Sequence, residues 1–179
     1  MNTTSVIELS QSALENNINF IKNNLGANVK MSSVIKGNAY GHGIEHFVPM
    51  AEKAGIDHFS VFSSDEAWQV KSVCDSQSDI MIMGWIDEHD REWVIESGIE
   101  FFVFQIEFLK DIIERAKYLG KKAKVHLEVE TGMNRTGLNR RQLRQTLPIL
   151  KENSEFITLK GVCTHYAGAE SIANHVRVQ

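Results

Sequence analysis

Short apolar runs alternate with longer amphipathic stretches along this chain. Runs of about four to eight residues rich in Val, Ile and Phe are typical of strands, whereas apolar positions that recur every three or four residues are typical of helices. The expected strands lie at 29–35, 57–62, 79–83, 99–104, 123–130 and 157–164. Helical patterns separate them, so the sequence predicts six strand–helix units.

The ends of the expected helices carry their own signals. The first helix is expected to begin at Ser10, a good N-cap, and to end at Gly26. Ser64 is expected to cap a later helix, with Asp65 and Glu66 in the first turn, where negative charge suits the helix dipole. Further helices are expected at 43–54, 87–97, 105–119 and 139–152, and a last one near Ala169.

Strands that alternate with helices indicate an α/β fold with a parallel sheet and right-handed crossovers. Two architectures fit this order: a doubly wound open sheet and a (β/α)₈ barrel. A complete barrel needs eight strands in roughly 250 residues, and this chain offers six. Periodicity alone leaves both architectures open.

The composition suits a globular chain with one sizeable core, since 42% of the 179 residues are hydrophobic and 23% are charged. A net charge of -4 gives no sign of a nucleic-acid partner. Cys74 and Cys163 are too few for a disulfide scaffold and wrongly spaced for a metal site. No signal-peptide pattern and no membrane-length apolar stretch is found, so we expect a cytoplasmic protein without a metal or a membrane contact.

Three expected strands end in residues that could carry chemistry. Lys36 follows the first strand and precedes a glycine-rich turn; in the mouth of a sheet it could lose its proton and form a Schiff base. Arg135 lies in a glycine-bounded loop and could bind a carboxylate, and His165 follows another strand. Each alone has a plainer reading, as a solvent-facing lysine, a surface arginine or a structural histidine. Together they would converge on one mouth of a parallel barrel.

Three segments resemble, in order and spacing, the N-terminal signatures of the alanine racemase family: IKGNAYGHG, ETGMNRTGL and CTHYAGAE. The opening segment TTSVIELSQSALENNINFIK is also similar to the family's. The resemblance implies a (β/α)₈ barrel that binds pyridoxal 5'-phosphate, followed by a C-terminal β domain, in a head-to-tail homodimer. Residues 1–179 would then form one partial barrel domain, with about six of eight strand–helix units and without the β domain.

The resemblance also assigns roles by position. Lys36 matches the lysine that forms the Schiff base with pyridoxal 5'-phosphate, and Tyr40 matches the tyrosine that reaches its phosphate. Arg135 matches the arginine beside the cofactor's phenolic oxygen and the substrate carboxylate, and His165 the histidine against the pyridine ring. The implied reaction interconverts L-alanine and D-alanine for peptidoglycan precursors. The family's second base belongs to a region with no match here, so we expect the isolated chain to be inactive.

Two departures from the family pattern bear on these assignments. Gly37 and Asn38 stand where many members have Ala and Asp. Glu128 stands where many members have a carbamylated lysine, and we hypothesise that it orients Arg135 by a charge-assisted hydrogen bond. Otherwise Glu128 is an interior carboxylate with another partner.

Two other functions remain open within the same fold. Asn38 is similar to the residue that related fold-type III amino-acid decarboxylases carry, although TGMNRTG argues against that class. Non-catalytic barrel proteins that bind pyridoxal 5'-phosphate typically have a lysine where this chain has Arg135. The substrate could also extend from alanine to serine, lysine or arginine.

Overall fold

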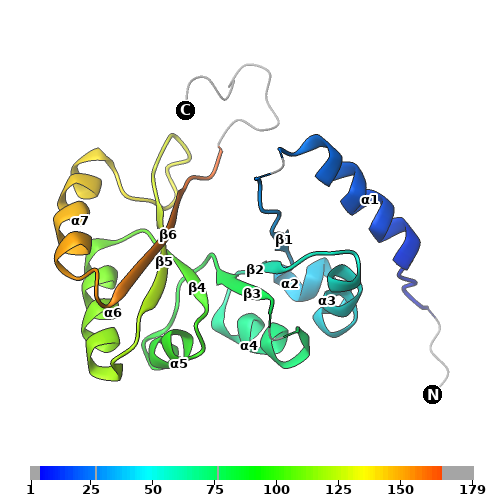
Figure 1. Cartoon of the computed structure of the whole chain (residues 1–179), viewed down its shortest axis with the longest axis horizontal. Helices are drawn as coiled ribbons and strands as arrows, with labels where there is room; N and C mark the ends of the chain where they lie inside the picture. Colours follow the sequence, from blue (N-terminus) through cyan, green and yellow to red (C-terminus); the bar gives the residue numbers. More distant parts are fainter. Residues whose placement is uncertain (1–4, 27, 76, 167–179) are drawn as a thin grey trace. The chain divides into compact units, whose positions relative to one another are not determined.

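The computed structural model describes residues 5–26, 28–75 and 77–166. The chain divides into two compact units, Met1–Trp85 and Ile86–Gln179, which we call the N-terminal and the C-terminal unit. Each combines parallel strands with helices (Figure 1). No helix in the described part of the chain is long and apolar enough to cross a bilayer.

The N-terminal unit alternates helices with three strands. Its strands pair in parallel in the order β1-β2-β3, with Phe59 opposite both Ser33 and Ile80. Its elements are α1 (Gln11–Asn24), β1 (Ser33–Val34), α2 (Lys36–Tyr40), α3 (Ile44–Lys53), β2 (His58–Val61), α4 (Ser64–Val73) and β3 (Asp79–Ile82).

The C-terminal unit repeats this pattern. Its strands pair in parallel in the order β4-β5-β6, with a register shift between Val125 and His126. Its elements are η1 (Glu88–Asp90), α5 (Arg91–Glu96), β4 (Glu100–Val103), α6 (Ile106–Leu119), β5 (Ala123–Glu128), α7 (Arg140–Glu152) and β6 (Ile157–Cys163). The prediction of parallel strands separated by helices is therefore confirmed in both units.

Four expectations about the elements need correction or comment. β1 spans two residues instead of 29–35, because only Ser33 and Val34 lie in register with residues of β2. Ser63, and not Ser64, caps α4, since its hydroxyl accepts a hydrogen bond from the Glu66 N–H at 3.3 Å. The helix expected at 87–97 is divided into η1 and α5. The helix expected near Ala169 lies outside the described residues.

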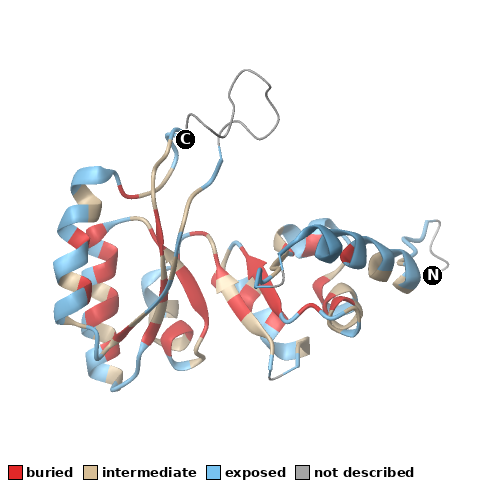
Figure 2. Cartoon of the chain, turned by 45° about the horizontal axis from the view of Figure 1, so that its top comes forward, coloured by how far each residue is buried: buried red, intermediate tan, exposed pale blue. Residues whose placement is uncertain are grey.

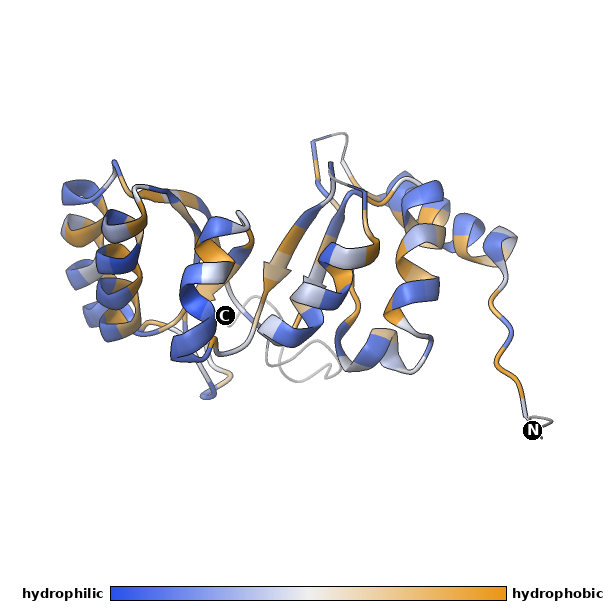
Figure 3. Ribbon diagram, turned by 90° about the horizontal axis from the view of Figure 1, so that it is seen from below, coloured by the Kyte–Doolittle hydropathy of each residue, from blue (hydrophilic) through white to orange (hydrophobic). Residues whose placement is uncertain are grey.

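The core lies between the strands and the helices that cover one of their faces. Alternate residues on β4 and β5, such as Phe101, Val103 and Val125, are fully buried (Figure 2). α6 supplies a matching apolar side, and Figure 3 shows apolar and polar positions alternating along the helices. Successive side chains of a strand point to opposite faces of the sheet, so every second residue faces the core.

The other face of the C-terminal sheet carries polar groups. Glu100, with a side chain 2% exposed, bonds His126 through Oε2 at 2.6 Å and Lys160 through Oε1 at 2.8 Å. A buried carboxylate needs such partners, because leaving a charge without them in a protein interior is costly. Gly161 makes room for this cluster, since a Cβ at that position would lie 3.1 Å from Nδ1 of His126.

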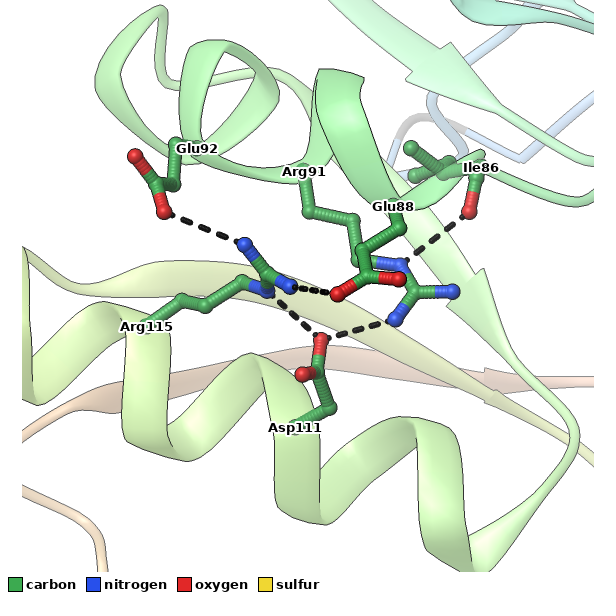
Figure 4. A network of polar contacts seen from close by, with 6 residues as sticks. All are labelled: Ile86, Glu88, Arg91, Glu92, Asp111 and Arg115. Atoms are coloured by element: carbon green, nitrogen blue, oxygen red, sulfur yellow. Dashed lines mark hydrogen bonds and ion pairs between the residues drawn. The ribbon is translucent and has the colours of Figure 1, made fainter.

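An ion-pair network joins α6 to η1 and α5 (Figure 4). The Arg115 guanidinium donates to Asp111, Glu92 and Glu88 at 2.8, 3.0 and 3.0 Å, and Arg91 donates to Asp111 at 2.9 Å. Burial alone would raise the pKa of Asp111, but the hydrogen bonds from Arg115 and Arg91 outweigh it and lower the pKa below 3.8. The network thus fixes how η1 and α5 meet α6.

We expect Arg115→Met to lower the free energy of unfolding by about 1–2 kcal/mol at pH 7, because three carboxylates lose a shared partner. Urea denaturation measures this loss. Lys117→Met on the same helix is the control, since its single exposed ion pair with Glu114 is worth less than about 0.5 kcal/mol.

The same comparison has a defined pH dependence. The pKa of Asp111 is lower in the folded state, so its contribution is present above about pH 4 and is lost as the pH falls through the folded pKa. The difference in the free energy of unfolding between the Arg115→Met variant and the wild type should therefore become smaller in acid. If Arg115→Met lowers the free energy of unfolding at pH 7 by no more than Lys117→Met does, the role given to the network is contradicted.

Candidate active site

Lys36 lies directly at the carboxyl end of β1. The preceding residue, Ile35, is 1% exposed, and its N–H donates to the Ser60 carbonyl at 2.8 Å, which extends the pairing with β2 by one residue. Lys36 itself is half-buried. The amine therefore stands where parallel sheets place their functional groups.

A left-handed turn follows the lysine. Gly37, Asn38, Ala39 and Tyr40 have φ angles of 61°, 53°, 54° and 54°. Such angles are unfavourable for residues with a Cβ and persist only when neighbouring contacts hold them. The Ala39 N–H donates to the Ile35 carbonyl at 2.8 Å, and Ala39 is 3% exposed.

Asn38 closes this turn against the next helix. Its Oδ1 accepts a hydrogen bond from the Ile44 N–H, at the start of α3, at 2.9 Å. Its carbonyl accepts from the Gly43 N–H at 3.0 Å. Asn tolerates left-handed angles better than most residues. The turn thus gives a local structural reason for Asn38.

Tyr40 is the last residue with a Cβ in the left-handed run. Its side chain lies mostly in solvent, with 64% of the residue exposed. The next residue, Gly41, also has a positive φ, of 91°, and donates to the Gly37 carbonyl at 3.1 Å. The phenol of Tyr40 and the amine of Lys36 are therefore presented by one short, closely hydrogen-bonded segment.

Arg135 lies in the loop that follows β5. The loop is closed at its base, where the Leu138 N–H donates to the Glu128 carbonyl at 2.7 Å and the Glu130 N–H donates to the Leu138 carbonyl at 3.1 Å. Gly137 has a φ of 118°, and a Cβ there would lie 2.6 Å from the Glu130 nitrogen. Arg135 is exposed at the outer part of this loop.

The Glu130 carboxylate organises the interior of the same loop. Backbone N–H groups of Gly132, Asn134, Arg135 and Met133 lower the pKa of Glu130, the first of them contributing most. The Gly132 N–H bonds its Oε1 directly. The ionised carboxylate thus shapes the backbone that carries Arg135.

A second contact ties this loop to the segment after β6. The hydroxyls of Thr131 and Thr164 lie 2.6 Å apart. The next residue, His165, is exposed. The C-terminal unit therefore brings the Arg135 loop and the segment that contains His165 together at neighbouring strand ends.

Glu128, at the end of β5, is 4% exposed and accepts a hydrogen bond from the Thr136 hydroxyl at 3.1 Å through Oε1. Within residues 77–166, no ion pair joins Glu128 to Arg135. The hydrogen-bond partner of the Glu128 carboxylate is therefore Thr136, the residue that follows Arg135. The hypothesis that Glu128 orients Arg135 stays a prediction.

Sequence analysis missed two residues near these side chains. Glu66 was assigned only to the first turn of a helix, but its carboxylate accepts a hydrogen bond from the Gly37 N–H at 2.6 Å. Cys163 pairs in register with Glu128. Neither contact has a local signal, since 29 and 35 residues separate the partners along the chain.

Parallel strands that alternate with helices, with Lys36, Arg135 and His165 after strand ends, are typical of domains from (β/α)₈ barrels. The family model described as the alanine racemase N-terminal domain matches residues 9–179, and the chain belongs to this family.

Relatives in sequence and structure agree with this assignment. The chain is 35% identical over 175 residues to an alanine racemase of Leptospira interrogans, covering 96% of this chain and 43% of that protein. A Bartonella henselae alanine racemase structure with covalently bound pyridoxal phosphate has a TM-score of 0.82 and 27% identity, covering 93% of this chain and 48% of that one. A Leuconostoc mesenteroides histidine racemase has a TM-score of 0.80 and 28% identity, covering 89% and 42%. The chain thus spans less than half the length of these relatives.

Cys163 offers a chemical probe of this region. Burial, and to a lesser extent the charge of Glu128, raise the pKa of the Cys163 thiol to about 12. We expect its alkylation by iodoacetamide at pH 8 to be far slower in the folded protein than in urea, because the thiolate is the nucleophile.

Glu128→Gln should accelerate this alkylation roughly threefold or more, since removal of a nearby negative charge lowers the thiol pKa. Peptide mass spectrometry at Cys163 gives the rate, and circular dichroism reports whether the fold is kept. Glu155→Gln, at an exposed position, is the control. Equal rates in the two variants would contradict the influence of Glu128 on the Cys163 thiol.

Proposed function

We propose that this chain carries the cofactor-binding part of a pyridoxal-phosphate-dependent amino-acid racemase, with alanine as the substrate. The main observation is the position of Lys36, at the carboxyl end of β1 and at the start of a tightly bonded turn, in a chain whose residues 9–179 match the racemase domain.

The side chains that the two units present suit pyridoxal 5'-phosphate. The half-buried amine of Lys36 can attach the aldehyde, and the exposed phenol of Tyr40 can donate to the phosphate. Neither the Lys36 amine nor the Arg135 guanidinium makes a hydrogen bond or an ion pair within the described residues. When bound, the cofactor supplies an electron sink for the substrate's α-carbon.

The chain's own residues would then bind the substrate and move its proton. Arg135 would hold the substrate carboxylate in a fork and contact the phenolic oxygen of the cofactor. His165 would pack against the pyridine ring. Lys36 would act as the acid and base on one face of the α-carbon. A tyrosine of the partner subunit in a homodimer would serve the other face.

Glu128 fits a supporting role for Arg135. Thr136 uses one carboxylate oxygen, and Oε2 receives no hydrogen bond from any described residue. A carboxylate oxygen with spare acceptor capacity is suited to a guanidinium donor. A bidentate contact would hold Arg135 in the orientation that carboxylate binding requires.

Alanine is the substrate that the curated relatives' name supports. The similar histidine racemase structure shows that a different amino acid can be used by a protein of this fold. We therefore propose amino-acid racemisation in the cytoplasm, with D-alanine for peptidoglycan precursors as its product. Product analysis separates this from decarboxylation, which would release an amine and carbon dioxide.

Lys36→Ala should abolish covalent retention of pyridoxal 5'-phosphate, because no other amine would be held at that strand end. The measurement is borohydride reduction of the mixture, followed by peptide mass spectrometry of the chain. Lys53→Ala, an exposed lysine, is the control. The wild-type chain should retain the cofactor at Lys36 yet form no D-alanine, since the second base is expected outside it. Sustained D-alanine formation by residues 1–179 alone would refute the need for that second base.

Glu128→Gln should reduce kcat/KM for alanine about tenfold or more in a form that continues beyond Gln179 through the region present in the relatives, here called the extended form. The loss should appear mainly as a higher KM if Arg135 binds the substrate carboxylate. Stopped assays of D-alanine with a coupled oxidase measure it, with Glu155→Gln as the matched charge control. Wild-type kinetics in the Glu128→Gln variant would contradict the proposal that Glu128 supports Arg135.

A further inference from the structure

We infer that Glu66 is the positioning residue of Lys36. Its carboxylate binds the peptide N–H that follows the lysine and also an N–H at the carboxyl end of β2. This inference rests on the proposed function for the identity of the bound group, although the contact itself does not. Glu66 lies in the first turn of α4 and is half-buried.

Both oxygens of the Glu66 carboxylate are used, and by different strand ends. Oε1 accepts from the Gly37 N–H at 2.6 Å, and Oε2 accepts from the Phe62 N–H at 2.8 Å. Phe62 follows β2 and Gly37 follows Lys36, which itself follows Ile35 at the end of β1. One side chain therefore bridges the carboxyl ends of two neighbouring strands.

The local sequence suggests a simpler role that the structure rejects. Ser63 and Glu66 have the spacing of a capping box, in which the glutamate would accept from the N–H of Ser63 itself. The Ser63 hydroxyl does accept from the Glu66 N–H. The Glu66 carboxylate, however, bonds Phe62 and Gly37 instead. Helix capping therefore does not account for this side chain.

The bond to Gly37 lies where the backbone most needs an anchor. Gly37 is the first of four residues with left-handed angles, and its N–H is the first donor after Lys36. The second residue of the run, Asn38, is held by its side chain, which accepts a hydrogen bond from the Ile44 N–H. Because Glu66 fixes the near end, it sets the direction in which the Lys36 side chain leaves the sheet.

Glutamine is the sharp test of this role. It matches glutamate in size but has one acceptor oxygen, so it can satisfy only one of the two N–H groups and would place an amide donor against the other. In the chain without cofactor, Glu66→Gln should speed hydrogen exchange of the Gly37 amide about tenfold or more. Covalent attachment of pyridoxal 5'-phosphate to Lys36, trapped with borohydride, should slow about tenfold.

Asp65→Asn is the matched control. Asp65 is exposed in the same first turn, so this variant removes the same charge from the helix N-terminus without touching either strand end. Its exchange and attachment rates should stay within about twofold of the wild type, because a lost helix-dipole contact is worth little. Glu66→Asp keeps the charge but is shorter by one methylene, and should fall between the wild type and Glu66→Gln.

The outcomes separate this inference from the proposed function. Failure of the wild-type chain and the extended form to attach the cofactor at Lys36 would overturn the proposed function. Attachment in the wild type at a rate that Glu66→Gln leaves unchanged would overturn the positioning role. If Glu66→Gln does not fold, Glu66→Asp decides: wild-type rates in that folded variant would also overturn it. Slower attachment in folded Glu66→Asp, with Asp65→Asn unaffected, would support it.

Discussion

Four consecutive residues after Lys36 adopt left-handed backbone angles, and the surroundings of the lysine depend on how the molecule holds them there. Each residue with a Cβ in such a conformation costs ~1–2 kcal/mol. The cost is offset by burial of Ala39, by the Asn38 side chain on the next helix, and by the Glu66 carboxylate on the Gly37 N–H. A chain that turned in the ordinary right-handed sense would leave the sheet in another direction, with the amine elsewhere.

The loop of Arg135 is built by the same physical means in the other unit. A carboxylate is an acceptor with two oxygens, so it can bind several peptide N–H groups that no strand or helix satisfies. Glu130 does this within its own loop, and the hydrogen bonds that it accepts lower its pKa. Gly137 permits the close return of the chain, and the Thr131–Thr164 contact adds the segment before His165. Both candidate loops are thus held through the backbone.

Much of this fold could be predicted from periodicity, because buried strand residues and amphipathic helices obey local spacing. The limits of α1, α3, α6 and α7 follow from such signals, with Ser10 and Gly120 at their ends. The length of β1 was overestimated. Its apolar residues suggest a strand, but how far the strand extends depends on the residues of β2 that lie in register with it. The left-handed turn and Glu66 could not be predicted, because glycines fit any tight turn and the spacing of Ser63 and Glu66 resembles a helix cap. Their contacts join strand ends that only the folded sheet brings together.

Because acidic side chains hold the two loops through peptide N–H groups, they do not pair with the basic side chains of Lys36 and Arg135 in the described part of the chain. Within the described residues, the amine of Lys36 and the guanidinium of Arg135 make no ion pair, although acidic residues organise the backbone on which each is carried. Had Glu66 or Glu130 paired with these cations directly, a ligand would have to break a salt bridge before it could bind. Because the carboxylates are occupied by peptide N–H groups, they stabilise the loops and leave both cations available. The division of roles favours loops that are formed before a ligand arrives, and such preformed loops reduce the entropy lost on association.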